Sequence, residues 1–268
     1  MRIITLTTDY GIRDHYVAAL KGSLLSAVPG IQIADISNII QPFNLVQAGF
    51  VVRNAWHHFP EQTIHIISVE EKENAGRSVL ALHYHNHYFL AYDNGTLPLI
   101  FNGIPADIVS IDRKGMTSSK LFSELAKSIC NNVPVEQLGQ APTAIIDKRN
   151  FLPTVDKGNL ISTIIYVDDY GNAVTNIDEK LFEQHRKGRD FNIALKSSGE
   201  GITSISKGYH QVKLGEIAAI INEAGYLEIG MNNAKASQML NLKFGMNLRI
   251  QFNDNTNRKA DHQAHAHS

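Results

Sequence analysis

The first cluster of polar side chains comes directly after the first apolar run of the chain. The run Ile3-Ile4-Thr5-Leu6 ends in two threonine hydroxyls, the carboxylate of Asp9 and the glycine Gly11. In an open α/β sheet, ligands bind outside the carboxyl ends of the strands, so Asp9 is where the first strand would present a carboxylate to a ligand. The alternative is that Asp9 only starts a turn or caps the next helix.

A second candidate group lies in the later half of the chain, where Tyr170, Gly171 and Asn172 stand between two β-like runs. An aromatic ring can stack on a flat base, and an amide can hydrogen-bond the edge of that base, as a purine site requires. The same residues would also suit a plain hairpin turn with Gly171-Asn172 at its apex.

Three alternating histidines, His83, His85 and His87, would share one face of an uninterrupted strand and could there hold a metal. No carboxylate or cysteine accompanies them, and Asn86 favours a hairpin tip, so we predict no metal site. The sequence contains no nucleophile elbow, phosphate-binding loop, dinucleotide fingerprint or helical zinc motif. Known motifs therefore do not identify a reaction.

The elements that must position these groups alternate between strand and helix in the first half of the chain, which predicts a mostly parallel, helix-covered sheet. We expect this N-terminal α/β domain to span residues 1–145. The strands are expected at 3–6, 31–36, 63–69, 78–84 and 87–92, and the helices at 16–28, 45–59 and 119–131.

The pattern changes after a connector that contains proline and charged residues, at about 141–157. Short strands separated by Gly/Asn turns indicate an antiparallel β-barrel or sandwich over residues 158–253. We expect these strands at 160–167, 191–195, 216–222, 227–230 and 248–252. The His-rich tail, residues 254–268, is predicted to be disordered.

Bulk composition excludes some classes of partner. Basic residues number 25 and acidic residues 26, so charge gives no reason to expect a nucleic acid or a membrane surface as the partner. The single cysteine, Cys130, excludes an internal disulfide and suits a reducing compartment. With no leader-like or membrane-spanning stretch in this sequence, we expect a cytoplasmic protein that binds a small molecule.

Motifs spread over nearly the whole chain, in order and at matching spacing, resemble the S-adenosylmethionine hydroxide adenosyltransferase family, which is related to the fluorinase and the chlorinase. They are Thr8-Asp9-Tyr10-Gly11, Asp35-Ile36-Ser37, Pro42-Phe43, Asp93-Asn94-Gly95, Tyr170-Gly171-Asn172, and Asn222 with Gly225-Tyr226-Leu227-Glu228-Ile229. The resemblance implies an N-terminal α/β domain, a C-terminal β-barrel and a homotrimer. S-adenosylmethionine would bind between the N-terminal domain of one subunit and the C-terminal domain of the next, as the substrate, with no cofactor.

The resemblance also implies roles for individual residues. Asp9 would accept hydrogen bonds from the ribose diol, and Phe43 would pack against the ligand. The adenine pocket would consist of Tyr170, Asn172 and Tyr209. The methionine end would face Asp14, Tyr16, Asn222 and Glu223.

The reaction implied is displacement at the ribose C5′ carbon by water or hydroxide, which gives adenosine and L-methionine. The related hydrolases position the water with an aspartate, an arginine and a histidine. Glu70 stands at the aspartate position, Arg77 at the arginine position and Thr117 at the histidine position. Two hypotheses follow: a hydrolase with this altered set of catalytic residues, or a catalytically degenerate protein that binds S-adenosylmethionine or adenosine. A halide-using enzyme is disfavoured, because Glu70-Glu71 replaces the Tyr-Pro loop typical of the halogenases.

Overall fold

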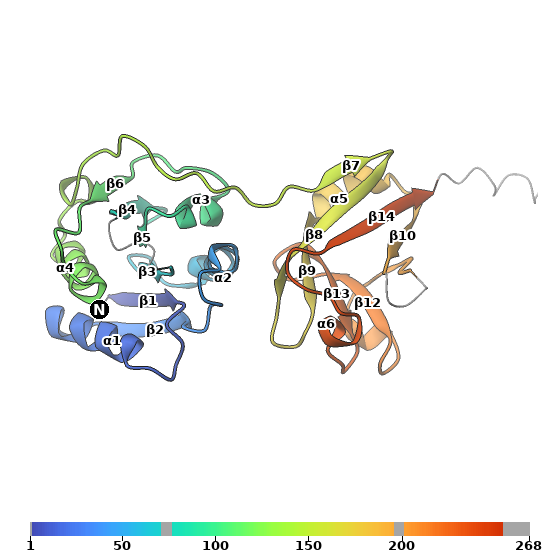
Figure 1. Ribbon diagram of the computed structural model, residues 1–268, viewed down its shortest axis with the longest axis horizontal. Coiled ribbons are helices and arrows are strands. Elements are labelled where there is room, and N and C mark those ends of the chain that lie inside the picture. Colours follow the sequence, from blue (N-terminus) through green and yellow to red (C-terminus); the bar gives the residue numbers. More distant parts are fainter. Residues whose placement is uncertain (1, 71–76, 196–200, 254–268) are drawn as a thin grey trace, which may run out of the picture. The chain divides into compact units, whose positions relative to one another are not determined.

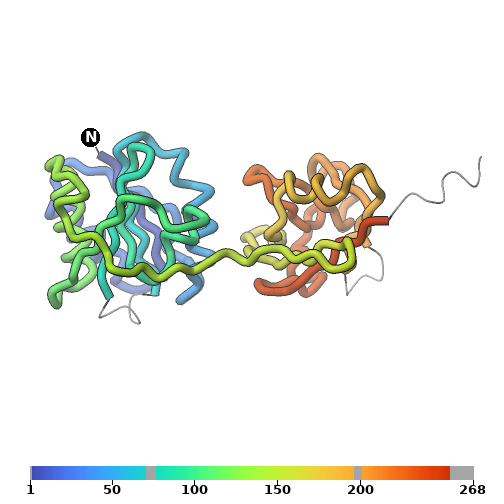
Figure 2. The backbone as a smooth tube through the Cα atoms, turned by 90° about the horizontal axis from the view of Figure 1, so that it is seen from above, coloured from blue at the N-terminus to red at the C-terminus, as the bar shows by residue number. Residues whose placement is uncertain are grey.

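The computed structural model describes residues 2–70, 77–195 and 201–253, so the His-rich tail lies outside the described residues. Internal contacts divide the chain into two units, Met1–Asn150 and Phe151–Ser268. Each unit is one continuous stretch of sequence, blue to green for the first and yellow to red for the second (Figure 2).

A six-stranded sheet forms the centre of the N-terminal unit, with strand order β2-β1-β3-β5-β4-β6 (Figure 1). Its four neighbouring strands β2, β1, β3 and β5 run parallel, and β4 is antiparallel to both of its neighbours. The predicted mostly parallel sheet is therefore confirmed. The strands are β1 Ile3–Thr8, β2 Gln32–Ser37, β3 Ile64–Ser68, β4 Val79–Tyr84, β5 His87–Tyr92 and β6 Val109–Ile111.

Helices cover both faces of this sheet, which explains why its central strands are apolar almost throughout. Ile66 and Ile67, adjacent on β3, point to opposite faces and belong to different cores. One core includes residues of α1 and α4, and the other includes residues of α2 and α3 (Figure 1). The helices are α1 Tyr16–Ala27, α2 Leu45–Ala55, α3 Thr96–Phe101 and α4 Ser118–Cys130, with the short 3-10 turns η1 Trp56–His58 and η3 Val135–Gln137.

The alternating histidines lie at a hairpin, as Asn86 indicated. β4 and β5 pair in an antiparallel hairpin, and both residues of the turn, His85 and Asn86, have positive φ values of 45° and 59°. His83 stacks on Tyr88 with ring centroids 4.6 Å apart, whereas His87 bonds the buried His65. No group of three or more potential metal ligands occurs among residues 2–70, 77–195 and 201–253.

The C-terminal unit is a single antiparallel sheet that curls into a half-barrel around one core, with strand order β10-β14-β8-β9-β13-β12-β11 and β7 beside β8. Only the short β11 runs parallel to its neighbour in the described part of the sheet. The predicted antiparallel β domain is confirmed. Its strands are β7 Thr154–Asp156, β8 Asn159–Val167, β9 Ala173–Asp178, β10 Asp190–Ala194, β11 Ile205–Ser206, β12 Ile217–Ile221, β13 Tyr226–Met231 and β14 Asn247–Asn253.

Two helices and a 3-10 turn connect these strands: α5 Glu179–Arg186, η4 Tyr209–Gln211 and α6 Ala236–Met239. The sequence pattern did not indicate α5. Asp178 caps this helix by accepting a 2.7 Å hydrogen bond from the backbone N–H of Leu181, and Phe182 is its one buried residue. None of the helices in the described ranges has the length and apolar character that crossing a membrane requires.

Candidate functional site

The carboxyl ends of β1 and β3 place Asp9 next to the loops that follow the neighbouring strands. One carboxylate oxygen of Asp9, Oδ2, accepts hydrogen bonds from the backbone N–H of Phe43 at 3.0 Å and from the backbone N–H of Glu70 at 3.1 Å. Phe43 belongs to the loop after β2, and Glu70 follows β3. Asp9 therefore holds three loops together at this edge of the sheet.

Both residues held by Asp9 adopt a backbone conformation that side chains disfavour. Phe43 has a φ of +67° and Glu70 a φ of +63°. A bulky residue in this left-handed region costs on the order of 1–2 kcal/mol and persists only where the surroundings impose it. The Phe43 ring gains little from burial in return, because 54% of the residue is exposed. Strain of this kind is concentrated at ligand sites.

Two residues of this unit are predicted to face the methionine end of the ligand, and both lie close to Asp9 in the chain. Asp14 and Tyr16 are exposed at the start of α1. The Tyr16 ring lies 6.0 Å from the ring of Tyr10, and the Tyr10 hydroxyl lies 2.7 Å from Ser68 Oγ at the end of β3. Tyr16 is thus connected to the same edge of the sheet.

The three residues at the predicted catalytic positions occur at different places in this unit. Glu70 is half-buried beside Asp9, and Arg77 is exposed just before β4. Residues 71–76 between them lie outside the described part of the chain. Thr117 is exposed and caps α4, where its hydroxyl accepts a 3.4 Å hydrogen bond from the backbone N–H of Lys120.

A chain of buried polar groups, which the sequence pattern did not indicate, begins one residue after Thr117. Ser118 Oγ accepts hydrogen bonds from the hydroxyl of Tyr92 and, at 3.0 Å, from Arg113 Nη2. Ser68 donates to the Tyr92 hydroxyl at 3.4 Å and also contacts Tyr10. Hydrogen-bonded groups thus extend from the residue after Asp9 to the start of α4.

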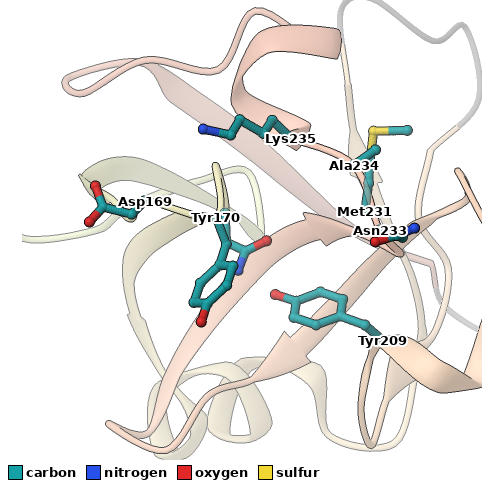
Figure 3. Close-up of a pocket in the computed structure, with 8 residues that line it drawn as sticks. Asp169, Tyr170, Tyr209, Met231, Asn233, Ala234 and Lys235 are labelled. Carbon is teal, nitrogen blue, oxygen red and sulfur yellow. The ribbon is translucent and has the colours of Figure 1, made fainter.

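The C-terminal unit contains a pocket of about 540 Å³, within the range typical of small-molecule sites. Tyr170 lines it from the turn after β8, and Tyr209 lines it from η4 (Figure 3). Asn172, from the same turn as Tyr170, also lines it. The three residues predicted for the adenine pocket therefore meet around one cavity. The lining residues that the sequence analysis did not identify are Asp169, Met231, Asn233, Ala234 and Lys235.

Asp168 holds the Asn172 side of the pocket. Its Oδ1 accepts from the backbone N–H of Asn172 at 2.7 Å, and its Oδ2 accepts from Asn172 Nδ2 at 3.0 Å. Gly171, with a φ of +82°, lies against Lys235, where an added Cβ would come within 2.7 Å of the lysine Cβ. Glycine is therefore required for the turn to approach the opposite wall of the pocket.

A buried carboxylate, Glu228 on β13, holds the Tyr209 side of the pocket. The Tyr209 hydroxyl donates to Glu228 Oε1, and Asn222 Nδ2 donates to Oε2 at 2.8 Å. Burial and this carboxylate together raise the pKa of the Tyr209 hydroxyl, so the hydroxyl keeps its proton. Asn222 also orders the turn before β13 by accepting backbone N–H bonds from Ala224 and Tyr226, whereas Glu223 is exposed.

Gly230, which has no side chain, leaves room on the sheet for the side chains of both Asn172 and Tyr209. A Cβ on Gly230 would lie 2.5 Å from Asn172 Oδ1 and 2.6 Å from the Tyr209 hydroxyl oxygen. No real Cβ atom tolerates such contacts. A side chain at this position would therefore displace both polar groups from the pocket.

Two family models match the chain, one for each unit. The model described as the S-adenosylmethionine (SAM) hydroxide adenosyltransferase N-terminal domain matches residues 4–139, and that of the C-terminal domain matches residues 162–249. The chain belongs to the SAM hydroxide adenosyltransferase family. Both groups of polar residues described above fall within the matched ranges.

Named relatives of this SAM hydroxide adenosyltransferase family member include both hydrolases and fluorinases. The (R)-S-adenosyl-L-methionine hydrolase of Methanocaldococcus jannaschii is 27% identical, with 90% of this chain and 93% of the relative covered. A fluorinase of an Actinoplanes species is 20% identical, with 92% and 97% covered. A crystal structure of a conserved protein from Thermotoga maritima, also 27% identical, superposes with a TM-score of 0.80 over 92% of this chain and 99% of that chain.

Proposed function

We propose that the protein is an S-adenosyl-L-methionine hydrolase, which uses water to cleave its substrate into adenosine and L-methionine. The observation that carries the proposal is the pocket lined by Tyr170, Asn172 and Tyr209, since it offers aromatic faces and an amide edge in a chain of this family. S-adenosylmethionine is the substrate, and no cofactor takes part. The exposed carboxylate of Asp14, with Tyr16, Asn222 and Glu223, would face its methionine end.

Asp9 is proposed to bind the ribose diol. Its Oδ2 is occupied by two backbone N–H groups, and this leaves Oδ1 as the carboxylate oxygen for ribose hydroxyls. Because the same two bonds position the backbone of Phe43 and Glu70, one side chain would bind the ribose and hold the proposed proton acceptor. Orientation of this kind can supply a large share of a rate enhancement.

The chemistry requires only a positioned water and an acceptor for its proton. The oxygen of water forms a bond to C5′ while the C5′–S bond breaks, and the bonding electrons go to sulfur. Methionine therefore leaves as a neutral thioether that no acid need protonate. The carboxylate of Glu70 takes the proton, and Arg77 and Thr117 orient the water.

Assembly and compartment also belong to the proposal. We propose a homotrimer, as the family resemblance implies, in the cytoplasm. Cys130 supports a reducing compartment: its thiol is free and packs against the core of the N-terminal unit, and burial raises its pKa despite the opposing effect of Arg2.

The test is incubation of purified protein with S-adenosylmethionine and detection of adenosine and methionine by mass spectrometry. We expect turnover above the rate without protein, a loss of turnover in Asp9→Ala, and at least a roughly hundredfold loss in Glu70→Ala. Glu124→Ala, an exposed position on α4, is the matched control and should retain the parental rate. Unchanged turnover in Glu70→Ala would exclude the role given to Glu70.

A second candidate function is ligand binding without turnover. It is favoured by Thr117, a helix cap at the position where related hydrolases have a histidine. Nucleoside retained through purification, with no adenosine formed from added S-adenosylmethionine, would establish this function and exclude the hydrolase.

A further inference from the structure

We infer that Asp168 sets the base selectivity of the pocket, because it holds the Asn172 amide with its carbonyl oxygen toward the ligand. The pocket would then take a 6-amino purine in preference to a 6-oxo purine. This inference rests on the proposed function and deepens it, since it names the residue that makes the pocket select the adenine base of the proposed substrate.

The orientation of the amide follows from the chemistry of its neighbour. A carboxylate can only accept hydrogen bonds, so the Asn172 atom 3.0 Å from Asp168 Oδ2 must be the NH₂ group. The other oxygen of Asp168 accepts from the backbone N–H of Asn172, so the two residues form a closed pair of hydrogen bonds. The amide cannot flip without opposing its oxygen to a carboxylate.

The remaining amide atom, Oδ1, lies where a ligand can reach it. This oxygen belongs to the pocket-lining residue Asn172, and it lies over Gly230 beside the Tyr209 hydroxyl. Within the described ranges, the side-chain hydrogen bond of Asn172 is the one to Asp168, and it uses Nδ2 and not Oδ1. An exocyclic amino group would donate to it, whereas the oxygen of a 6-oxo purine would face it with a second acceptor. Leaving such polar groups unmatched in a pocket lowers affinity.

The competing explanation is that Asp168 only builds the turn from Asp168 to Asn172. Replacement of Asp168 by asparagine separates the two roles. One side-chain oxygen still accepts from the backbone N–H of Asn172, so the turn bond survives. The other oxygen becomes an NH₂ group, which can donate to the Asn172 Oδ1 and turn that amide so that its NH₂ faces the ligand.

The experiment is calorimetric titration of the full chain with adenosine and with inosine, which carry an amino group and an oxo group at C6. We expect the parent to prefer adenosine by roughly 10- to 100-fold, the effect of one unmatched polar group. In Asp168→Asn we expect the ratio of the two affinities to move at least about tenfold toward inosine.

Asp169→Asn is the matched control, since Asp169 is the next residue, lines the same pocket and carries the same charge. This change should alter both affinities together and leave their ratio unchanged. If Asp168→Asn does not fold, Asp168→Ser replaces it: its hydroxyl can accept from the backbone of Asn172 but leaves the amide unheld, so the ratio should fall.

The outcomes separate the inference from the proposal beneath it. If the parent prefers adenosine and the Asp168 variants weaken both nucleosides equally, Asp168 serves only the turn and the inference is wrong, while the proposed function stands. If the parent binds neither nucleoside, the purine pocket itself is refuted.

Discussion

Phe43 combines a backbone conformation that favours glycine with a bulky aromatic side chain. Its φ of +67° suits glycine, yet its ring is more than half exposed beside Asp9. We predict that Phe43→Gly raises the free energy of unfolding by about 1 kcal/mol relative to Phe43→Ala, because glycine relieves the strained backbone. Both variants lose the ring, so both should bind the nucleoside equally weakly.

Chemical denaturation of the two variants gives the stability difference, and calorimetry with adenosine gives the affinities. The alanine variant is the control for loss of the ring. A glycine variant less stable than the alanine variant would mean that the left-handed conformation carries no strain. Retained affinity in both would mean that Phe43 does not contact the ligand.

At the residue scale, groups that act through their neighbours in the chain were easier to predict than groups that act across the fold. Asn172 could be predicted as a pocket residue because Tyr170 and Gly171, the other residues of its turn, are next to it in the chain. Glu228 was not, because a glutamate between Leu227 and Ile229 is typical of a strand position that faces solvent. Its burial, at 6% exposure, depends on Tyr209 and on the curl of the sheet, which no local pattern reveals.

At the scale of the element, we expect a pH response from β3, through His65. Burial, with a smaller contribution from His87, lowers the pKa of His65 from 6.5 to about 3. Its Nδ1 lies 2.7 Å from Thr5 Oγ1, and its Nε2 lies 3.1 Å from His87 Nδ1. The pKa of His87 is also lowered, chiefly by burial and further by His83 and His85, while Glu61 opposes the shift.

The folded state therefore keeps His65 uncharged at pH values where the unfolded chain protonates it. The contribution of uncharged His65 to the free energy of unfolding is therefore complete above pH 6.5. It is lost as the pH falls from 6.5 toward 3, by up to about 1.4 kcal/mol per pH unit. We predict that the free energy of unfolding of the parent falls more steeply over this window than that of His65→Gln. Denaturant titrations at several pH values measure both slopes.

His58→Gln is the matched control, because His58 is exposed in η1 of the same unit. Its slope should equal that of the parent. Equal slopes for the parent and His65→Gln would show that His65 is not buried uncharged in the folded protein.

At the element scale, the parallel sheet was predictable because long apolar runs alternate with helical patterns, whereas α5 was not. This helix is eight residues long, follows β9 without a break and buries only Phe182. Its charged sequence is typical of a solvated turn. The helix forms because Asp178 caps it and Phe182 packs against Phe191 and Phe252, contacts that exist only once the sheet has curled.

At the scale of the whole molecule, the N-terminal unit exposes several large apolar side chains in the loops near Asp9. Ile12 is 77% exposed and Ile39 is 56% exposed, and Tyr16 and Phe43 are also exposed. Backbone hydrogen bonds from Gly11 to Asn38 O and from Phe43 to Asp9 bring the loops that carry Ile12, Ile39 and Phe43 together. Apolar side chains exposed on neighbouring loops are typical of interfaces. The proposed trimer would cover them.

We therefore predict that sedimentation of the parent gives three times the chain mass of 29.7 kDa, and that Ile12→Glu gives the mass of one chain. A buried carboxylate without a partner costs several kcal/mol at an interface, whereas the exposed loop of a monomer tolerates it.

Leu25→Glu is the control: Leu25 is 52% exposed on α1, away from the Asp9 loop in the chain. A trimeric Ile12→Glu would place the interface elsewhere, and a monomeric parent would refute the assembly. If Ile12→Glu also loses adenosine formation while it remains folded, the complete site needs more than one copy of the chain.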